Sequence, residues 1–192
     1  MTTRDRVVTG GVALGARAGR LNSFLSATGK NVEQLMPPWG EAIWHEFIKI
    51  TEELFLQNDE QWRLEDIAHT KGIRVDKLGE TKRLIDQSNS LRIGRIDQID
   101  QLIAQLANEQ TGRRPHVHLS ETVGEMIDRI CILLLKVEGA VDPEARDLAE
   151  RKFKHLTRSL DLTLFAILEG RAVLPPSGNF KIYRPLKGES DD

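Results

Sequence analysis

The stretch Ser120–Lys136, "SETVGEMIDRICILLLK", constrains the fold of this chain more than any other. It predicts a helix with apolar side chains over most of its circumference, which is typical of a helix in the centre of a protein. An unpaired buried charge costs several kcal/mol, so neighbouring helices are expected to supply partners of opposite charge. The charged residues of this stretch are Glu121, Glu125, Asp128, Arg129 and Lys136.

Helical spacing places most of these polar side chains on one face. Residues three, four and seven apart share a side of a helix. Because apolar residues occupy the remaining circumference, this face predicts an interior polar network or cleft, with Glu121 at its rim. We expect both Asp128 and Arg129 to form a charged hydrogen bond to another helix. The members of the face are Glu125, Asp128, Arg129, Ile132 and Lys136.

The rest of the chain favours an all-α fold. Among 192 residues there are one Tyr, six Phe and three Trp, and alternating Val, Ile and Thr runs are scarce. Helical periodicity and the Gly and Pro breakers predict an antiparallel bundle of four main helices plus one short helix. Ser120 is the expected N-cap of the fourth. The expected helices cover residues 40–57, 60–69, 77–108, 120–138 and 143–168.

The chain length suits one helical domain with less regular ends. Residues 1–38 are expected to form a flexible or loosely docked arm, 39–170 the bundle, and 171–192 a docked, extended tail with a disordered acidic tip. Cys131 is alone in its apolar run, which excludes an intrachain disulfide and predicts a small core residue.

Charge and hydropathy exclude several classes of partner. The net charge is -2 with both signs interspersed, so there is no electrostatic footprint for a nucleic acid. No segment reaches the roughly 18 apolar residues that a membrane span needs. The apolar patch of the N-terminal arm is broken by four residues, which is unlike a secretory signal and predicts a cytoplasmic protein. These are Gly10, Gly11, Gly15 and Arg17.

Two other segments offer polar partners for the fourth helix. "NDEQWRLED" places Glu65 and Asp66 one turn after Trp62, and a second segment repeats polar residues at steps of four, three and three. Both signs of charge are therefore available across the bundle. The members of this second stripe are Lys82, Asp86, Asn89 and Arg92.

Four motifs contain these same residues. They read N-x-x-x-W-x-x-E-D from Asn58, K-R-x-I-D-x-x-N-x-x-R from Lys82, E-T-V-G-E-M-I-D-R-I-x-I-L-x-L-K from Glu121, and F-K-x-Y from Phe180. Their order and spacing resemble domain-of-unknown-function family 4254 of bacteria, over about two thirds of the chain. The chain departs from that pattern at Arg63, where the family has histidine, and at Arg184, which replaces an Asn-Asp pair.

The resemblance implies a helical bundle and a setting in bacterial surface-sugar or other biosynthetic loci. It implies no established reaction. A biosynthetic partner enzyme is an expectation that rests on the resemblance alone. The apolar first helix and the long third helix separately predict self-association into a homo-oligomer.

The sharpest functional hypothesis is a site for an anionic small molecule, such as a sugar phosphate or nucleotide sugar. Cationic side chains would bind the anion, and acids would bind hydroxyls or act as acid–base groups. No cofactor or metal is expected. The candidate catalytic residues are Glu65, Asp66, Glu125 and Asp128. The candidate ligand-binding residues are Trp62, Lys82, Asp86, Asn89, Arg92, Arg129, Lys136, Lys181 and Tyr183.

The C-terminal tail is expected to fold back over the bundle. Phe180 and Ile182 would be buried, while Lys181 and Tyr183 would reach the mouth of the cleft. The tail would then act either as a strap that covers the core or as a lid on a ligand.

Three alternatives stay open. In the first, the polar network only fixes helix packing in a structural or accessory module. In the second, acids hold magnesium in a helical phosphohydrolase, with Glu121 joining the four candidate catalytic residues. In the third, "LRIGRIDQIDQLIAQL" resembles the first helix of helical chorismate mutases, and Arg95, Lys136 and Arg146 would bind a dicarboxylate.

Overall fold

The computed structural model describes residues 41–108 and 117–176, and four helices hold most of them. The all-α class is thereby confirmed. Two short strands pair in parallel, with Val117 opposite Ala172. The predicted arm, and residues 177–192 of the predicted tail, which include Lys181 and Tyr183, lie outside the described residues. The helices are α2 (Glu41–Ala68), α3 (Val75–Asn108), α4 (Val123–Gly139) and α5 (Pro143–Leu168), and the strands are β1 (Val117–His118) and β2 (Ala172–Val173).

The first two expected helices are one. α2 continues through residues 57–60, so the prediction of a separate short helix over 60–69 is wrong. No Gly or Pro interrupts this segment. The polar side chain of Asn58 is accommodated because its Nδ2 donates to the Leu54 carbonyl, 3.1 Å away, one turn earlier. The helix ends before Gly72, whose φ of 80° lies in the left-handed region that glycine adopts without strain.

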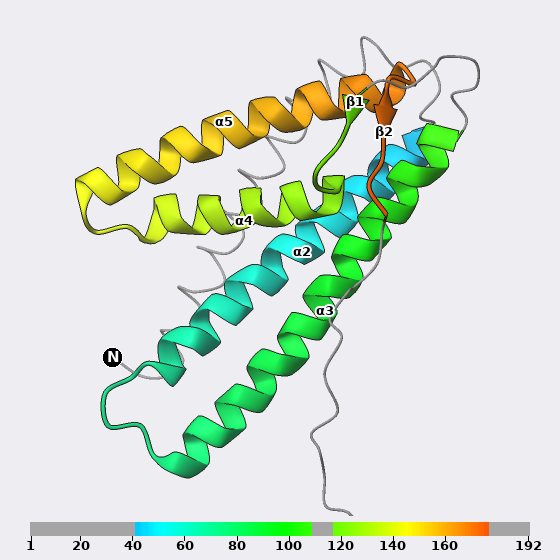
Figure 1. Cartoon of the computed structure of the whole chain (residues 1–192). Helices are drawn as coiled ribbons and strands as arrows, with labels where there is room; N and C mark the ends of the chain where they lie inside the picture. Colours follow the sequence, from blue (N-terminus) through cyan, green and yellow to red (C-terminus); the bar gives the residue numbers. More distant parts are fainter. Residues whose placement is uncertain (1–40, 109–116, 177–192) are drawn as a thin grey trace, which may run out of the picture.

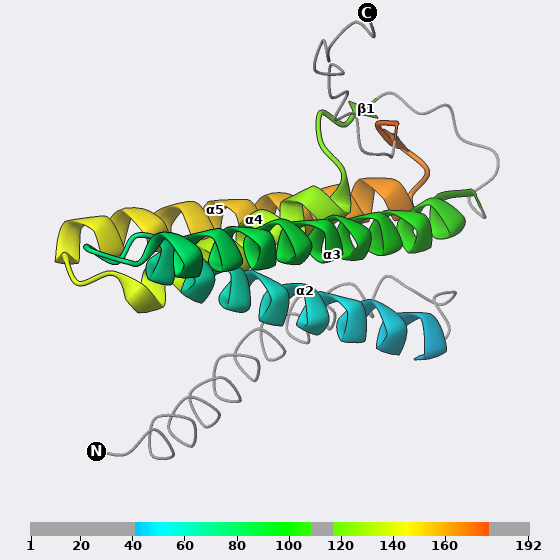
Figure 2. The same cartoon turned by 90° about the horizontal axis from the view of Figure 1, so that it is seen from below.

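The helices form two hairpins (Figure 1). α2 and α3 run side by side in opposite directions, and α4 and α5 do the same across them. Figure 2 shows α2 to one side of the other three helices. α4 contacts each of the other three helices, which is the central position that its apolar circumference predicts.

The core lies where α4 meets its neighbours. Burying a Leu, Ile or Phe side chain contributes roughly 1.5–3 kcal/mol, so this cluster supplies most of the driving force for packing the two hairpins. Cys131 is fully buried within it, as expected. Fully buried members from all four helices include Phe47, Leu54, Phe55, Ile99, Ile103, Ile127, Ile130, Leu160, Leu164 and Ile167.

The two strands tie the start of α4 to the end of α5. The Val117 N–H donates to the Arg171 carbonyl over 3.0 Å, and the Leu119 N–H donates to the Val173 carbonyl over 3.1 Å. The α4–α5 hairpin is therefore joined at one end by its turn and at the other by β1 and β2. Across the described part of the chain, none of the helices combines the length and apolarity needed to cross a membrane.

Candidate functional site

A polar network centred on Asp128 joins three helices. Asp128 lies on α4 and is buried. Asn58 of α2 donates through Nδ2 to Asp128 Oδ1 over 2.9 Å. Arg92 of α3 donates through Nη1 to Oδ2 over 3.1 Å, and through Nη2 to Asn89 Oδ1 over 2.9 Å. The predicted charged hydrogen bond from Asp128 to another helix is therefore present.

The Asp128 carboxylate is already satisfied by the protein. Oδ1 accepts from Asn58 and also lies 3.4 Å from Arg92 Nη1, while Oδ2 accepts from Arg92. The side chains of Asp128 and Arg92 are only 11% and 21% exposed, so solvent screens this ion pair little. Burial, together with the neighbouring Asp128 charge, raises the pKa of the Cys131 thiol. Cys131 therefore stays protonated, as befits a core residue rather than a nucleophile.

A second polar contact holds the start of α4 against α3. The Gly124 N–H donates to Asp100 Oδ1 over 2.7 Å. A Cβ on Gly124 would lie 2.6 Å from the Ile96 carbonyl oxygen, so only glycine permits this approach. Burial is the largest influence on Asp100 and raises the pKa of its carboxyl, against the opposing hydrogen bonds from Thr122 and Gly124.

Thr122 is the N-cap of α4, where Ser120 was expected. Its Oγ1 accepts from the Glu125 N–H over 3.1 Å, and Glu125 Oε2 accepts from the Thr122 N–H over 2.8 Å. This reciprocal pair is a capping box. Glu125 is exposed and caps α4. This is a structural role, whereas a catalytic role was expected from the sequence.

The expectation that the polar face of α4 is largely buried is wrong, because among its members only Asp128 is buried. Arg129 Nη2 contacts Glu121 Oε1 at 2.7 Å, within the same segment of chain, and the Arg129 side chain is 55% exposed. Lys136 is also exposed. Successive helical residues point about 100° apart. Asp128 therefore faces α2 and α3, while Arg129 lies toward the groove beside α5.

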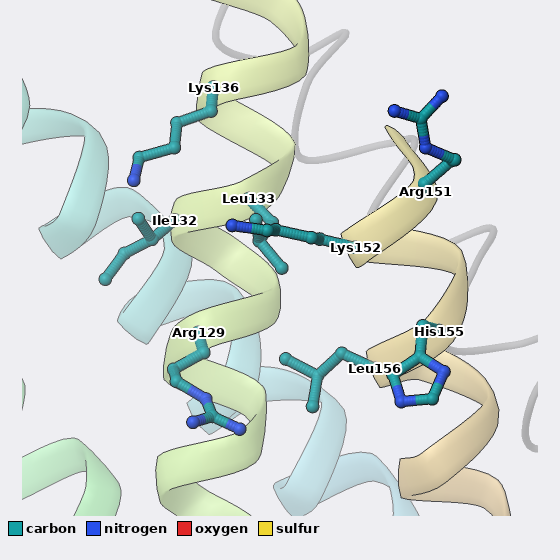
Figure 3. A pocket seen from close by; sticks show the side chains of 8 residues that line it. All are labelled: Arg129, Ile132, Leu133, Lys136, Arg151, Lys152, His155 and Leu156. Carbon is teal, nitrogen blue, oxygen red and sulfur yellow. The ribbon is translucent and has the colours of Figure 1, made fainter. Parts of the chain in front are cut away.

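That groove contains a cavity of about 600 Å³ between α4 and α5 (Figure 3). Of the described side chains that line it, five are basic and none is acidic. Ile132, Leu133 and Leu156 supply its apolar surface. The described lining residues are Arg129, Ile132, Leu133 and Lys136 from α4, with Arg151, Lys152, His155 and Leu156 from α5.

Two of the cations in this cavity lack acidic partners. Arg129 pairs with Glu121, and Arg151 pairs with Asp147 one turn away on α5. Within residues 41–108 and 117–176, neither Lys136 nor Lys152 forms an ion pair. Figure 3 shows Lys152 extending from α5 toward α4 across the groove. The cavity therefore presents uncompensated positive charge.

A second cavity, of about 330 Å³, continues from the first. The two share Leu133, Lys136 and Lys152. Trp62 of α2 borders the second cavity and is 37% exposed. The remaining lining residues are small or aliphatic: Gly139, Ala140, Ala145, Leu148 and Ala149.

Six of the predicted site residues lie in the Asp128 network or in the cleft between α4 and α5. Asp128, Asn89 and Arg92 form the network, whereas Trp62, Arg129 and Lys136 line the cleft. Several others line neither cavity and lie along α2 and α3. Glu65 is half-buried there and has His69 Nδ1 3.9 Å from its Oε2. The exposed members of this group are Asp66, Lys82 and Asp86.

The basic side chains that α5 contributes to the cavity were not among the predicted site residues. Arg151, Lys152 and His155 face the cavity from the segment "ERKFKH". Their basic cluster, at steps of one and three, was the available signal. This signal was not used because charged partners for the polar face of α4 were expected only from the segments that form α2 and α3.

The geometry does not assemble the alternative sites. Among the described residues, no group of three or more His, Cys, Asp or Glu side chains is placed to hold a metal ion, which leaves the magnesium hypothesis without a ligand set. Of the residues named for a chorismate-mutase-like site, Arg95 pairs with Glu53 at 3.0 Å and Arg146 donates to the Ala140 carbonyl. Neither lines the cavities that contain Lys136.

The sequence of this chain matches the model of a known protein family. The family model described as "Protein of unknown function (DUF4254)" matches residues 49–165, which is more than half of the chain. The chain therefore belongs to this family, and the expected resemblance is confirmed. Neither a curated protein nor a solved structure matches it.

Proposed function

We propose that this member of the DUF4254 family binds an anionic small molecule, such as a sugar phosphate or nucleotide sugar, in the cleft between α4 and α5. The observation that carries the proposal is a cavity of about 600 Å³ whose described lining includes five basic residues and no acidic one. This volume lies within the range of small-molecule sites. Lysine and arginine side chains are the usual partners of phosphate groups.

The two unpaired lysines strengthen the proposal. Lys136 and Lys152 face the same cavities from different helices. Both side chains are exposed, and neither forms an ion pair with a described residue, so an anion that binds here would meet positive charge that these residues do not neutralise. The rest of the lining then supplies shape through Leu133 and Leu156.

We assign a binding function and no reaction. In the part of the chain that the structure describes, no acid lines either cavity, and two of the candidate catalytic residues have other partners: Glu125 caps α4 and Asp128 pairs with Arg92. The catalytic roles first considered for these residues, and for Glu65 and Asp66, therefore stay hypotheses. We further propose that the two hairpins form one antiparallel bundle and that the protein serves a cytoplasmic biosynthetic pathway, such as one for surface sugars.

A second candidate is a non-catalytic accessory module that acts through its surface, with self-association or a biosynthetic enzyme as partner. The observation in its favour is the internal saturation of Asp128 by Asn58 and Arg92. A carboxylate whose acceptors are occupied by side chains of two other helices acts on helix packing, although the buried Arg92 Nε has no hydrogen-bond partner among the described residues. Both candidates are compatible with the same fold, and ligand binding separates them.

The test is isothermal titration calorimetry with three probes: inorganic pyrophosphate, a hexose 1-phosphate and a uridine diphosphate hexose. We expect at least one to bind, and Lys152→Ala to weaken its affinity by about tenfold or more, because a charge-assisted hydrogen bond contributes roughly 1.5–3 kcal/mol. Lys154→Ala is the matched control. Lys154 lies two residues away, pairs with Glu150 and lines neither cavity.

Two results would contradict the proposal. One is the absence of binding by all three probes at millimolar concentration. The other is an equal loss of affinity in Lys152→Ala and Lys154→Ala, which would indicate unspecific attraction by surface charge.

A further inference from the structure

We infer that the ligand is a nucleoside phosphate, with its planar base in the second cavity against Trp62 and its phosphate between Lys136 and Lys152. This inference rests on the proposed function and names the class of molecule that the same cleft would take. It distinguishes a ligand with an aromatic ring from a bare sugar phosphate.

The first step is the continuity of the two cavities. They share one leucine and two lysines, so a ligand anchored on the lysines reaches both. Along α4 the lining extends from Arg129 to Gly139, which is roughly 15 Å at about 1.5 Å per residue. The cleft is therefore long enough for a molecule with two chemically distinct ends.

The second step is the contrast between those ends. The larger cavity holds Arg129, Arg151 and His155 in addition to the shared lysines. Within residues 41–108 and 117–176, the smaller cavity adds no charged side chain of its own, and no hydroxyl, amide or carboxylate side chain borders it. A hydroxyl-rich sugar ring there would lose hydrogen bonds to water without replacing them, which is unfavourable. The smaller cavity thus selects against a carbohydrate and for an apolar group.

The third step is the aromatic side chain. Trp62 is a large ring left partly exposed at the border of this cavity, and among the described residues it is the only aromatic one that lines either of the two cavities. Nucleobases stack on such rings through their π faces regardless of base identity. The residues that line the same cavity near the α4–α5 turn are small, which leaves room for a flat group. A volume of about 330 Å³ suits one ring system, whereas a long acyl chain would extend into solvent.

The experiment compares pyrophosphate, a nucleoside diphosphate, a hexose 1-phosphate and octyl phosphate, with affinities measured by calorimetry and by tryptophan fluorescence. We expect the nucleoside diphosphate to bind about tenfold more tightly than pyrophosphate, because base stacking on an aromatic residue adds that much or more. It should also quench the fluorescence of Trp62. Trp62→Ala should remove both the gain and the quench while pyrophosphate still binds.

Two further variants keep the test independent of folding. Ala145→Leu fills the smaller cavity from an exposed position on α5, and should weaken the nucleoside diphosphate selectively. Trp44→Phe is the control for the fluorescence signal, because Trp44 stacks on Phe47 at 5.3 Å between ring centroids and lines neither cavity. It should leave the ligand-induced quench in place.

The outcomes separate the inference from the function beneath it. If pyrophosphate binds through Lys152 but the nucleoside diphosphate gains nothing and Trp62→Ala changes nothing, the inference is overturned and the anion site stands. The inference also fails if octyl phosphate or the hexose phosphate gains as much as the nucleotide. If none of the phosphates binds, the proposed function and the inference fail together.

Discussion

At the scale of single residues, position on a helix decides which charges enter the protein. Asp128 and Arg129 are adjacent in sequence, yet one is buried in an ion pair and the other is more than half exposed. A turn of about 100° per residue accounts for the difference. The same geometry separates the groups that hold the helices together from the groups available to a ligand.

Replacing Asp128 tests the first of these roles. Asp128→Ala is expected to lower the free energy of unfolding by about 3–5 kcal/mol, because it leaves the mostly buried Arg92 guanidinium without its carboxylate. Urea denaturation followed by circular dichroism measures the change. Asp86→Ala, at an exposed position on α3, is the control and should stay within about 0.5 kcal/mol of the natural protein. A loss below 1 kcal/mol (about the worth of a surface ion pair) for Asp128→Ala would contradict this role.

Asp100 predicts a dependence of stability on pH. Its pKa is raised from 3.8 in the folded state, mainly by burial, so the folded protein binds this proton more tightly than the unfolded chain does. Stability from this group is therefore present at low pH and is lost as pH rises from 3.8 through the higher folded value. Asp100→Asn keeps an acceptor for the Gly124 N–H but cannot ionise.

We expect the stability of Asp100→Asn, relative to the natural protein, to increase between about pH 4 and pH 7. Urea unfolding at both pH values measures the difference. Asp97→Asn on the same helix, one turn away and less buried, controls for the loss of a negative charge. A relative stability that is flat or falls over this interval would show that the Asp100 charge is well tolerated.

At the scale of helices and turns, apolar periodicity predicted most of the fold but misplaced several helix boundaries, above all the break inside α2. The third and fifth helices end where expected, and α4 is central, because long apolar stripes have few ways to be buried. The break expected after Gln57 is absent because Asn58 finds partners inside the protein. Such partners are tertiary contacts, which local sequence does not display.

The candidate site was predictable only in part for the same reason. Arg129 and Lys136 were found because their spacing along one helix is visible in the sequence. Lys152 and His155 were missed because the α4–α5 groove depends on how two helices pack. Trp62 was selected, although its neighbours across the cleft could be known only from the folded chain.

The contact between α4 and α3 leads to a prediction about glycine. Gly124→Ala is expected to destabilise the protein by about 1–3 kcal/mol, because the new Cβ would overlap the Ile96 carbonyl oxygen. Gly94→Ala on α3 is the matched control. Nothing lies within 4 Å of a Cβ at Gly94, so alanine there should be stabilising by about 0.5–1 kcal/mol. The midpoints of thermal and urea unfolding should fall for Gly124→Ala and rise for Gly94→Ala. An unchanged midpoint for Gly124→Ala would mean that α3 and α4 move apart with little loss of stability.

At the scale of the whole molecule, burial is unevenly distributed. The end of the α2–α3 hairpin, around Gly72, carries mostly exposed or half-buried side chains from residue 60 to residue 80. α4, in contrast, contributes many buried side chains and touches every other helix. The molecule therefore has a strongly packed half and a hairpin end held by few apolar contacts.

Hydrogen exchange should reveal this division. Amide protons at the distal end of α2 and the start of α3 should exchange by local opening, at a free energy well below that of global unfolding. Amides in the centre of α4, around Ile130, should exchange only through global unfolding. Mass spectrometry of exchanged peptides measures both, and equal protection in the two regions would contradict the prediction.

The parallel pairing of β1 with β2 has a mechanical consequence for the cleft. α4 and α5 are connected at both ends, by the turn at residues 140–142 and by the strand pair at the other end. Two helices connected in this way resist changes in the distance between them. The distance between the helices would then be the same in the free and the ligand-bound protein. Binding would therefore lose little free energy to backbone rearrangement. Selection in this cleft would then depend on fit to a fixed gap, with adjustment left to the lysine side chains.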